Sequence, residues 1–367
     1  MGLIYTMKNK PGQKNIKDML WGEMTASSFC REGHFMALQL NFPGMTTPIP
    51  MNESYITALT RGKNDIIFGG TSGTTAHIFA ASIRSTSGIA VDFGGDSVST
   101  ECRGLTCTSG DILVAGVNTP NNGRLWTRNA MTAMPDCIQE WGFDVSQPKI
   151  AYNFPKGEKV LCLTTDTTTV FVIGLTNKHV FMFNPKSNTV RLYNKQNIIR
   201  LTNLGGGNVV ALTSKGVVYK VETDKTMEIK FVALTKLDKC FTNKNVCISS
   251  NSIGGTFYIA DGKGSIYGIN LKKRNVKKVT SAHLRPVKCM TITNDGRLYG
   301  FCGDGMTNLF VYTPRTGEYK NLGVAVSVLN LRRYGYEFSC AVTGHDGELM
   351  FGENDRGGCL WAYFPKI

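Results

Sequence analysis

The fold is decided by residues 287–323, which read VKCMTITNDGRLYGFCGDGMTNLFVYTPRTGEYKNLG. Four short runs of β-branched and aromatic residues alternate here with turn signals. The sequence Asn-Asp-Gly at residues 294–296 separates the first two runs, and residues 314–317 separate the last two. The stretch therefore predicts four short antiparallel strands joined by tight turns.

This unit is one of seven copies. The other six start at residues 56, 103, 159, 206, 245 and 337, so successive copies begin about 40 to 57 residues apart. That spacing is typical of the four-stranded blade of a β-propeller. We predict an all-β fold, a single seven-bladed β-propeller of four-stranded antiparallel blades that occupies residues 1–367. The predicted blades are residues 55–98, 102–150, 158–195, 200–233, 245–280, 287–323 and 338–364.

The last copy ends after three strands, at Tyr363 and Phe364, so its blade lacks an outer strand. Residues 34–42 read HFMALQLNF and alternate apolar and polar positions, as a half-buried strand does. We predict that this N-terminal strand completes the last blade and closes the ring, because such closure removes most of the exposed sheet edge.

The segments LFVYTPRTGEY and VFMFNPKSNTV carry a resemblance that extends over residues 55–364. They resemble the third strand, turn and fourth strand of YVTN-like and quinoprotein-like propeller repeats. The Trp-Asp pairs of WD40 repeats, the double glycines of kelch repeats and the Trp-bearing signature of quinone-binding repeats are absent. The resemblance implies the fold and carries over no functional residue.

The formal net charge of +14 predicts an affinity for anions. Part of this charge lies in residues 270–279, NLKKRNVKKV, where Lys and Arg alternate with apolar residues. Such a pattern is typical of an outer strand that uses charge to prevent edge pairing. We interpret the segment as a solvated blade rim, and we do not expect nucleic acid as a partner.

The eleven cysteines are odd in number and sit mostly inside apolar strand runs, as Cys162 and Cys289 do, so we expect buried, reduced thiols. Cys102 and Cys107 have a C-x4-C spacing without a second pair nearby, so we expect no zinc site. The N-terminal region contains no basic segment followed by an apolar one, and no apolar stretch is long enough for a membrane span. We expect a soluble, cytoplasmic monomer without a membrane partner, or a secreted protein if a leader has been removed.

In a β-propeller, the loops between second and third strands and the links between blades meet on one face around the central channel. We call it the top face, and the repeat places many His, Arg and Tyr residues there. Third strands begin with His77, Arg124, His179, Asn308 and Cys359; the loops contribute Asn118, Asp304, Glu353, Asp355 and Arg356; and the links contribute Arg103, His283, Arg285, Arg332, Arg333, Tyr334, Tyr336 and Glu337. His345 and Asp346 fall on the opposite face. Any single top-face residue could instead hydrogen-bond a neighbouring blade.

The first functional hypothesis is a top face that binds an anionic carbohydrate and acts as a polysaccharide lyase, cleaving uronate-containing glycans by β-elimination. The reaction needs a cation or amide that neutralises the uronate carboxylate, a base that removes the adjacent proton, and an acid for the leaving oxygen. Some polysaccharide lyases use seven-bladed propellers with such residues, which is an analogy of fold. The assigned roles are His283 or His77 as base, Tyr334 or Tyr336 as acid, and Arg124, Arg285 and Arg332 as carboxylate clamps. The remaining predicted ligand-binding residues are Arg103, His179, Asn308 and Arg356.

The second hypothesis is a non-catalytic scaffold propeller that presents the same face to a protein, or to an acidic oligosaccharide or polysaccharide. A third is metal-assisted hydrolysis, with His77, His179 and Asp304 or Asp355 around a cation. The chain has no phosphate-binding loop, no H-E-x-x-H and no G-x-S-x-G motif. We therefore expect no cofactor and assign no metal ligand, and the choice between an enzyme and a binding module stays open.

Overall fold

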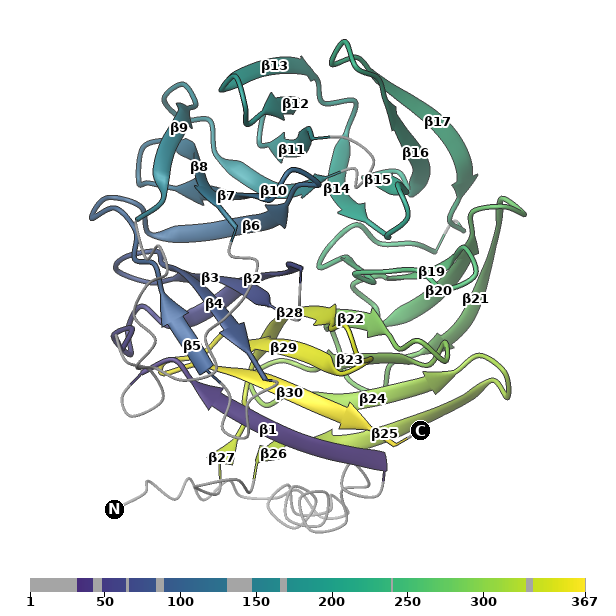
Figure 1. Ribbon diagram of the computed structural model, residues 1–367. Coiled ribbons are helices and arrows are strands. Elements are labelled where there is room, and N and C mark those ends of the chain that lie inside the picture. The colour runs from purple at the N-terminus through teal and green to yellow at the C-terminus, as the bar shows by residue number, and fades with distance from the viewer. Residues whose placement is uncertain are drawn as a thin grey trace, which may run out of the picture.

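The computed structural model describes residues 32–41, 48–63, 66–83, 89–130, 147–165, 170–238, 240–327 and 333–366. The named elements of these residues are all strands, and seven antiparallel sheets of four strands form a ring (Figure 1). The predicted all-β, seven-bladed propeller is therefore confirmed. Among the described residues, no helix has the length and apolar character that a membrane crossing needs.

The first three blades are meanders in which each strand pairs with the next along the chain. Blade 1 contains β2 (Tyr55–Arg61), β3 (Ile67–Ser72), β4 (Ile78–Ser82) and β5 (Ile89–Asp92). Blade 2 contains β6 (Glu101–Cys107), β7 (Ile112–Asn118), β8 (Gly123–Asn129) and β9 (Lys149–Asn153). Blade 3 contains β10 (Val160–Thr165), β11 (Val172–Thr176), β12 (His179–Asn184) and β13 (Thr189–Asn194).

The next three blades have the same strand order. Blade 4 contains β14 (Ile198–Asn203), β15 (Val209–Thr213), β16 (Val217–Thr223) and β17 (Ile229–Lys236). Blade 5 contains β18 (Cys247–Ile248), β19 (Thr256–Ala260), β20 (Ser265–Asn270) and β21 (Asn275–Ser281). Blade 6 contains β22 (Val287–Ile292), β23 (Leu298–Cys302), β24 (Asn308–Thr313) and β25 (Glu318–Val324).

Blade 7 is assembled from both ends of the chain. It contains β28 (Phe338–Thr343), β29 (Leu349–Glu353), β30 (Cys359–Pro365) and, as its outer strand, β1 (Gly33–Gln39). The pairing of β1 with β30 is antiparallel and continuous, from Gly33 opposite Pro365 to Gln39 opposite Cys359. The N-terminal strand thus closes the ring, while residue 42 of the predicted closing segment lies outside the described residues. A hairpin of β26 (Val326–Ser327) and β27 (Arg333–Tyr334) joins blade 6 to blade 7.

The first strand of each blade lies innermost, and first strands pack against each other in six of the seven neighbouring pairs of blades, all but blades 4 and 5 (Figure 1). In six blades the pairing of the first strand with the second skips one residue close to the strand's start. Such a β-bulge changes the direction of a side chain and increases local twist. The skipped residues are Thr57, Arg103, Leu161, Ile199, Lys288 and Ser339.

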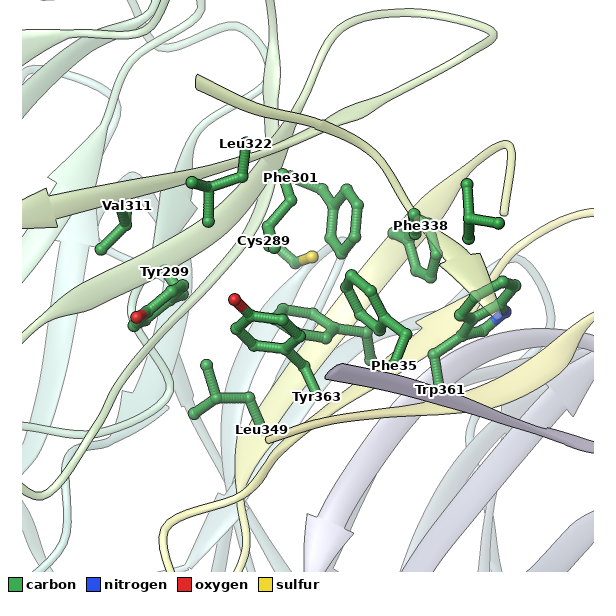
Figure 2. Close-up of a cluster of buried hydrophobic side chains, with 14 of the residues drawn as sticks. Phe35, Cys289, Tyr299, Phe301, Val311, Leu322, Phe338, Leu349, Trp361 and Tyr363 are labelled. Carbon is green, nitrogen blue, oxygen red and sulfur yellow. The ribbon is translucent and has the colours of Figure 1, made fainter. Parts of the chain in front are cut away.

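The core consists of apolar clusters between neighbouring blades, and the largest joins blades 6 and 7 (Figure 2). Phe35 of β1 contacts the rings of Trp361 and Tyr363, with centroids 5.6 and 4.6 Å away. Phe301 of blade 6 stacks on Phe338 of blade 7 at 3.8 Å. The N-terminal strand therefore stabilises the seam by hydrogen bonds and by inserting an aromatic side chain into the core.

Glycines in second strands make room for aromatic residues in third strands. Gly69 lies opposite Phe79 and Gly174 opposite Phe181. A Cβ atom would lie 2.0 Å from the Phe79 ring at the first position and 2.1 Å from the Phe181 ring at the second. Because the glycine lacks that atom, the ring packs flat over the neighbouring backbone.

Candidate functional site

The predicted top-face residues at the third strands have structural partners in three blades. In each, the side chain reaches a carboxylate in the link that precedes its own blade, rather than a carbonyl of a neighbouring blade. These contacts join His77 to Glu53, Arg124 to Asp96 and His179 to Glu158. The shared geometry ties the blade link to the third strand, which is a stabilising role.

His77 is held between two carboxylates. Its Nε2 lies 2.9 Å from Oε2 of Glu53, and its Nδ1 lies 3.0 Å from Oδ2 of Asp92. Burial opposes the charged form of the ring, but the hydrogen bonds and charges of Asp92 and Glu53 outweigh it and raise the pKa of His77 above 6.5. A ring that donates from both nitrogens has no lone pair for a substrate proton. The geometry thus argues against His77 as the base of an elimination.

Arg124 and His179 are also engaged. Nη1 of Arg124 donates to Oδ2 of Asp96 at 2.7 Å. Nδ1 of His179 lies 2.8 Å from Oε1 of Glu158, a carboxylate that is only 1% exposed and that also accepts the Thr176 hydroxyl. Both side chains orient loops of their own blades, and neither is positioned as a free ligand-binding group.

His283 has a different environment in the link between β21 and β22. Its Nδ1 lies 2.6 Å from the Tyr319 hydroxyl, and its Nε2 lies 3.5 Å from Nδ2 of Asn308. The histidine is exposed, while burial raises the pKa of Tyr319 well above its usual value, so that this phenol stays protonated. His283 and Asn308 are thus two predicted site residues that the structure brings together.

The two predicted tyrosines differ in exposure. Tyr334, in β27, packs against the cluster between blades 6 and 7. Tyr336 is 44% exposed, and its backbone carbonyl accepts the amide of Thr307, the residue before Asn308. The structure therefore places Tyr336 beside the blade that carries His283, and Tyr334 at the core.

The other predicted arginines are spread over the face. Arg285 is exposed, two residues after His283. Arg356 is exposed in the turn between β29 and β30. Arg332 lies outside the described residues.

Glu353, at the top-face end of β29, organises the surrounding backbone. The buried carboxylate accepts hydrogen bonds from the amides of Tyr336 and Cys359, at 3.2 and 3.0 Å, and from Nε1 of Trp361 at 3.0 Å. Burial raises the pKa of Glu353, partly offset by the Trp361 hydrogen bond and the charge of Arg333. Its contacts are internal, so its role is to shape the loop.

A cavity of about 400 Å³ opens at the top end of the central channel, where the first strands begin. We call it the channel mouth. Five of the bulged positions line it, together with Arg200, which follows the bulge of β14, and Asn354 of blade 7. The five are Thr57, Arg103, Leu161, Lys288 and Ser339. The bulges therefore direct side chains into one shared space.

The mouth is cationic. Arg103, Arg200 and Lys288 come from blades 2, 4 and 6, and no carboxylate is among the described residues that line the cavity. Arg103 pairs with Glu101 at 3.0 Å and Lys288 with Asp304 at 2.8 Å, both at the surface. Nε of Arg200 donates to the Val246 carbonyl at 3.4 Å. An anion in this cavity would lie between cations from three different blades.

The thiols at the mouth are unreactive. Burial raises the pKa of Cys247 and of Cys340 to about 12, so both remain protonated at neutral pH. They behave as small apolar groups of the channel wall. Among the described residues, no three His, Cys, Asp or Glu side chains are grouped to hold a metal ion.

Below the mouth, a second cavity of about 420 Å³ is lined mostly by hydroxyl and amide side chains. Thr60, Thr106 and Thr164 line it, and Thr202 and Ser250 line both cavities. Adjacent hydroxyls bond to each other between blades, as Ser250 does to Thr291 at 2.8 Å and Thr291 to Thr343 at 2.7 Å. The lining thus changes from three cations at the mouth to mainly uncharged side chains below it, where Arg61 is the one cation among the described lining residues.

Sequence reasoning found Arg103 but missed Arg200 and Lys288. A signal exists in the repeat, because a Thr follows each cation within three residues: RGLT from Arg103, RLT from Arg200 and KCMT from Lys288. Alignment of the copies on this Thr would have shown that the three cations lie at nearly the same height.

Comparison with known proteins identifies the fold and no family. The chain matches no known family description, and no curated protein is similar to it in sequence. The WD40 β-propeller domain of Doa1 superposes with a TM-score of 0.55 at 9% identity, over 86% of this chain and 94% of that one.

Two further structures are of extracellular domains from B. thetaiotaomicron. One, from a proposed one-component system, has a TM-score of 0.56 at 12% identity, and the other, from a proposed hybrid two-component system, has 0.56 at 11%. Each match covers 89% of this chain and 39% of the other. At these identities the likeness shows that the chain has a β-propeller fold.

Proposed function

We propose that this protein is a non-catalytic binding propeller whose channel mouth holds an acidic group of a carbohydrate. The observation that carries the proposal is the convergence of Arg103, Arg200 and Lys288 on one cavity of about 400 Å³. Cations that surround a concave site favour carboxylates, because the cavity limits screening by water. A cavity of this size lies within the usual range for small-ligand sites.

The hydroxyl and amide side chains of the channel support a carbohydrate over a simple anion. Thr57, Ser339 and Asn354 at the mouth, and the threonines below it, offer hydroxyl and amide groups that suit sugar hydroxyls. A uronate could place its carboxylate among the cations and its hydroxyl groups against this polar wall.

The environments of the residues proposed as acid and base favour a binding protein over an enzyme. His77 donates to two carboxylates, Tyr334 packs at the core, and the mouth thiols stay protonated. None of the four residues assigned to catalysis is among those that line the mouth.

The test is calorimetric titration with digalacturonate and with its neutral galactose counterpart. We expect the wild type to bind the acidic disaccharide, and Arg200→Ala with Lys288→Ala to weaken binding at least about tenfold, because two charge-assisted contacts are lost. The control is Lys225→Ala with Lys273→Ala, which removes two exposed cations from turns on the opposite face. Equal binding of both disaccharides, or equal affinity of both double variants, would refute the proposal.

A second candidate is the lyase, favoured by one observation: His283 is exposed and lies 2.6 Å from a protonated phenol, Tyr319. Its test is the ultraviolet absorbance of unsaturated product from polygalacturonate. Product formed by the wild type and by His345→Ala, but not by His283→Ala, would establish turnover and overturn the non-catalytic proposal.

A further inference from the structure

The net positive charge of the chain comes from one continuous segment, residues 178–288. Between Lys178 and Lys288 the sequence has twenty Lys and Arg against five Asp and Glu. All other residues together have twenty-one Lys and Arg against twenty-two Asp and Glu. Residues 178–288, which we call the cationic half, comprise the outer strands of blade 3, all of blades 4 and 5, and the link to blade 6 (Figure 1).

Within this half, each top-face turn between second and third strands carries one lysine. Lys178 lies between β11 and β12, Lys215 between β15 and β16, and Lys263 between β19 and β20. The turns of Lys215 and Lys263 are closed by a following glycine whose φ is +76° or +80°, a conformation that needs glycine. The corresponding turns of blades 1, 2, 6 and 7 contain no lysine.

The links between blades add cations between these lysines. Lys195 joins blade 3 to blade 4, Lys244 joins blade 4 to blade 5, and Arg285 joins blade 5 to blade 6. Turn and link residues therefore alternate around the top face. We call the set of six the cationic arc: Lys178, Lys195, Lys215, Lys244, Lys263 and Arg285.

The arc is available to a ligand. Five of its members are exposed, and Lys195 is half-buried. Within the described part of the chain, none of the six forms an ion pair, and Lys195 donates to the Asn177 carbonyl at 3.3 Å. The two nearby acids serve the backbone: Asp238 accepts the Cys240 amide, and Asp261, fully buried, accepts the amide of Ser265.

We propose that the cationic arc binds a linear acidic polysaccharide whose end residue occupies the channel mouth. The inference rests on the proposed function and extends it from a single acidic sugar to a polymer. Arc and mouth belong to one surface, because Arg200 lies on the first strand of blade 4 and Arg285 lies three residues before Lys288. A chain leaving the mouth over blades 3 to 5 would meet a cation at every turn and link.

Two observations favour a polysaccharide over a nucleic acid. The large exposed side chains of the described residues include no aromatic residue in the cationic half, so bases would have no stacking partner. A mouth of about 400 Å³ admits one strand of sugars but not a duplex.

The experiment compares a long polygalacturonate with digalacturonate on three proteins. The arc variant is Lys178→Ala, Lys215→Ala and Lys263→Ala. The matched control is Lys186→Ala, Lys225→Ala and Lys273→Ala, which removes the same charge from exposed turns at the opposite ends of the same third strands. The mouth variant is Arg200→Ala with Lys288→Ala.

We expect the arc variant to bind the polymer about tenfold more weakly or worse, since each lost contact is worth up to about fivefold, and to bind digalacturonate as the wild type does. The affinity of the wild type for the polymer should fall with added salt, and that of the arc variant should fall less. The control should bind both ligands like the wild type.

If the arc variant and the control bind the polymer equally, the proposal that the cationic arc binds a polysaccharide is overturned. In that case, loss of digalacturonate binding in the mouth variant would still support the proposed function of the channel mouth. The reverse result, polymer binding that depends on the arc but not on the mouth, would refute the proposed function and retain a polyanion surface. A duplex oligonucleotide that displaces the polymer at equal charge concentration would overturn the assignment to polysaccharide.

Discussion

Blades 3 to 5 and the other four blades share one repeat, but they use the charged residues of the top face differently. At the third strands of blades 1 to 3 and in the link to blade 7, basic side chains of the top face contact acids, as Arg124 does Asp96 at 2.7 Å and Arg333 does Glu353 at 3.5 Å. In the cationic arc, equivalent turns and links carry lysines without an ion pair among the described residues. The comparison teaches that basic residues of the top face can either hold a loop through an acid or stay exposed without an ion pair.

The reason is the balance between basic and acidic residues in the two parts of the chain. Twenty-one cations and twenty-two acids in the rest of the chain can neutralise one another, whereas five acids cannot neutralise the twenty cations of the cationic half. Exposed lysines on separate blades repel one another only weakly, because salt screens charges beyond about 8 Å. The fold therefore tolerates a set of exposed lysines without ion pairs among the described residues.

The largest expected effect tests whether the paired charges are structural. Glu353→Gln should lower the free energy of unfolding by about 3 kcal/mol, because the amide nitrogen would replace one carboxylate oxygen. It would then face either the Tyr336 amide, which donates to Oε1, or the two donors of Cys359 and Trp361 at Oε2. Denaturant unfolding measures this loss. Asp304→Asn, at an exposed ion pair with Lys288, is the control and should leave the midpoint unchanged. Equal losses in the two variants would contradict the structural role of Glu353.

The second effect tests a packing feature that blades 1 and 3 share. Gly69→Ala in blade 1 and Gly174→Ala in blade 3 should each cost about 2 kcal/mol, because the new Cβ would lie within the ring of Phe79 or Phe181. Gly110→Ala, whose Cβ would meet no atom closer than 3.7 Å, is the control for both. Thermal unfolding measures the loss of stability in each variant. If the losses for Gly69→Ala and Gly174→Ala differ by more than the effect of the Gly110→Ala control, the cores of the two blades are not equivalent.

The third effect depends on pH and concerns His77. Its pKa is raised in the folded protein, so its stabilising contribution is complete below about pH 6.5 and is lost as pH rises through the folded value. His77→Gln should cost about 2 kcal/mol at about pH 6 and clearly less at about pH 9.

Unfolding at both pH values, with His345→Gln as the control for removal of an exposed histidine, measures the difference. A cost for His77→Gln that is the same at both pH values would show that the Glu53 and Asp92 contacts do not hold a charged ring.

The smallest expected effect is on the stability of the arc variant. Because Lys178, Lys215 and Lys263 are exposed and without ion pairs in the described part of the chain, their replacement by Ala should change the free energy of unfolding by less than about 0.5 kcal/mol each. A larger loss, seen as a shifted denaturation midpoint, would place these lysines with the structural charges and remove the contrast between the halves.

Much of the architecture could be predicted because its signals are local. The Asn-Asp-Gly turn at residues 294–296 and the alternating strand at residues 34–42 each depend on neighbouring residues only. The positions of His77, His179 and Asn308 at the start of third strands followed from the same repeat.

The partners of these residues could not be predicted. His77 meets Glu53 and Asp92, which are separated from it by 24 and 15 residues. Sequence spacing does not report such contacts, because a loop of any such length can fold back. The roles assigned to His77 and Arg124 were therefore the weakest part of the sequence interpretation.

The sequence by itself determined the seven repeats, the strand that closes them and the excess of cations between Lys178 and Lys288. These are properties of composition and periodicity, which depend only on which residues stand near one another in the sequence. Only the tertiary structure decided that Arg103, Arg200 and Lys288 meet in one cavity. Their convergence requires a closed ring and β-bulges that turn side chains toward its axis. The direction of these side chains is set by the hydrogen-bond register between strands, which the order of residues does not show.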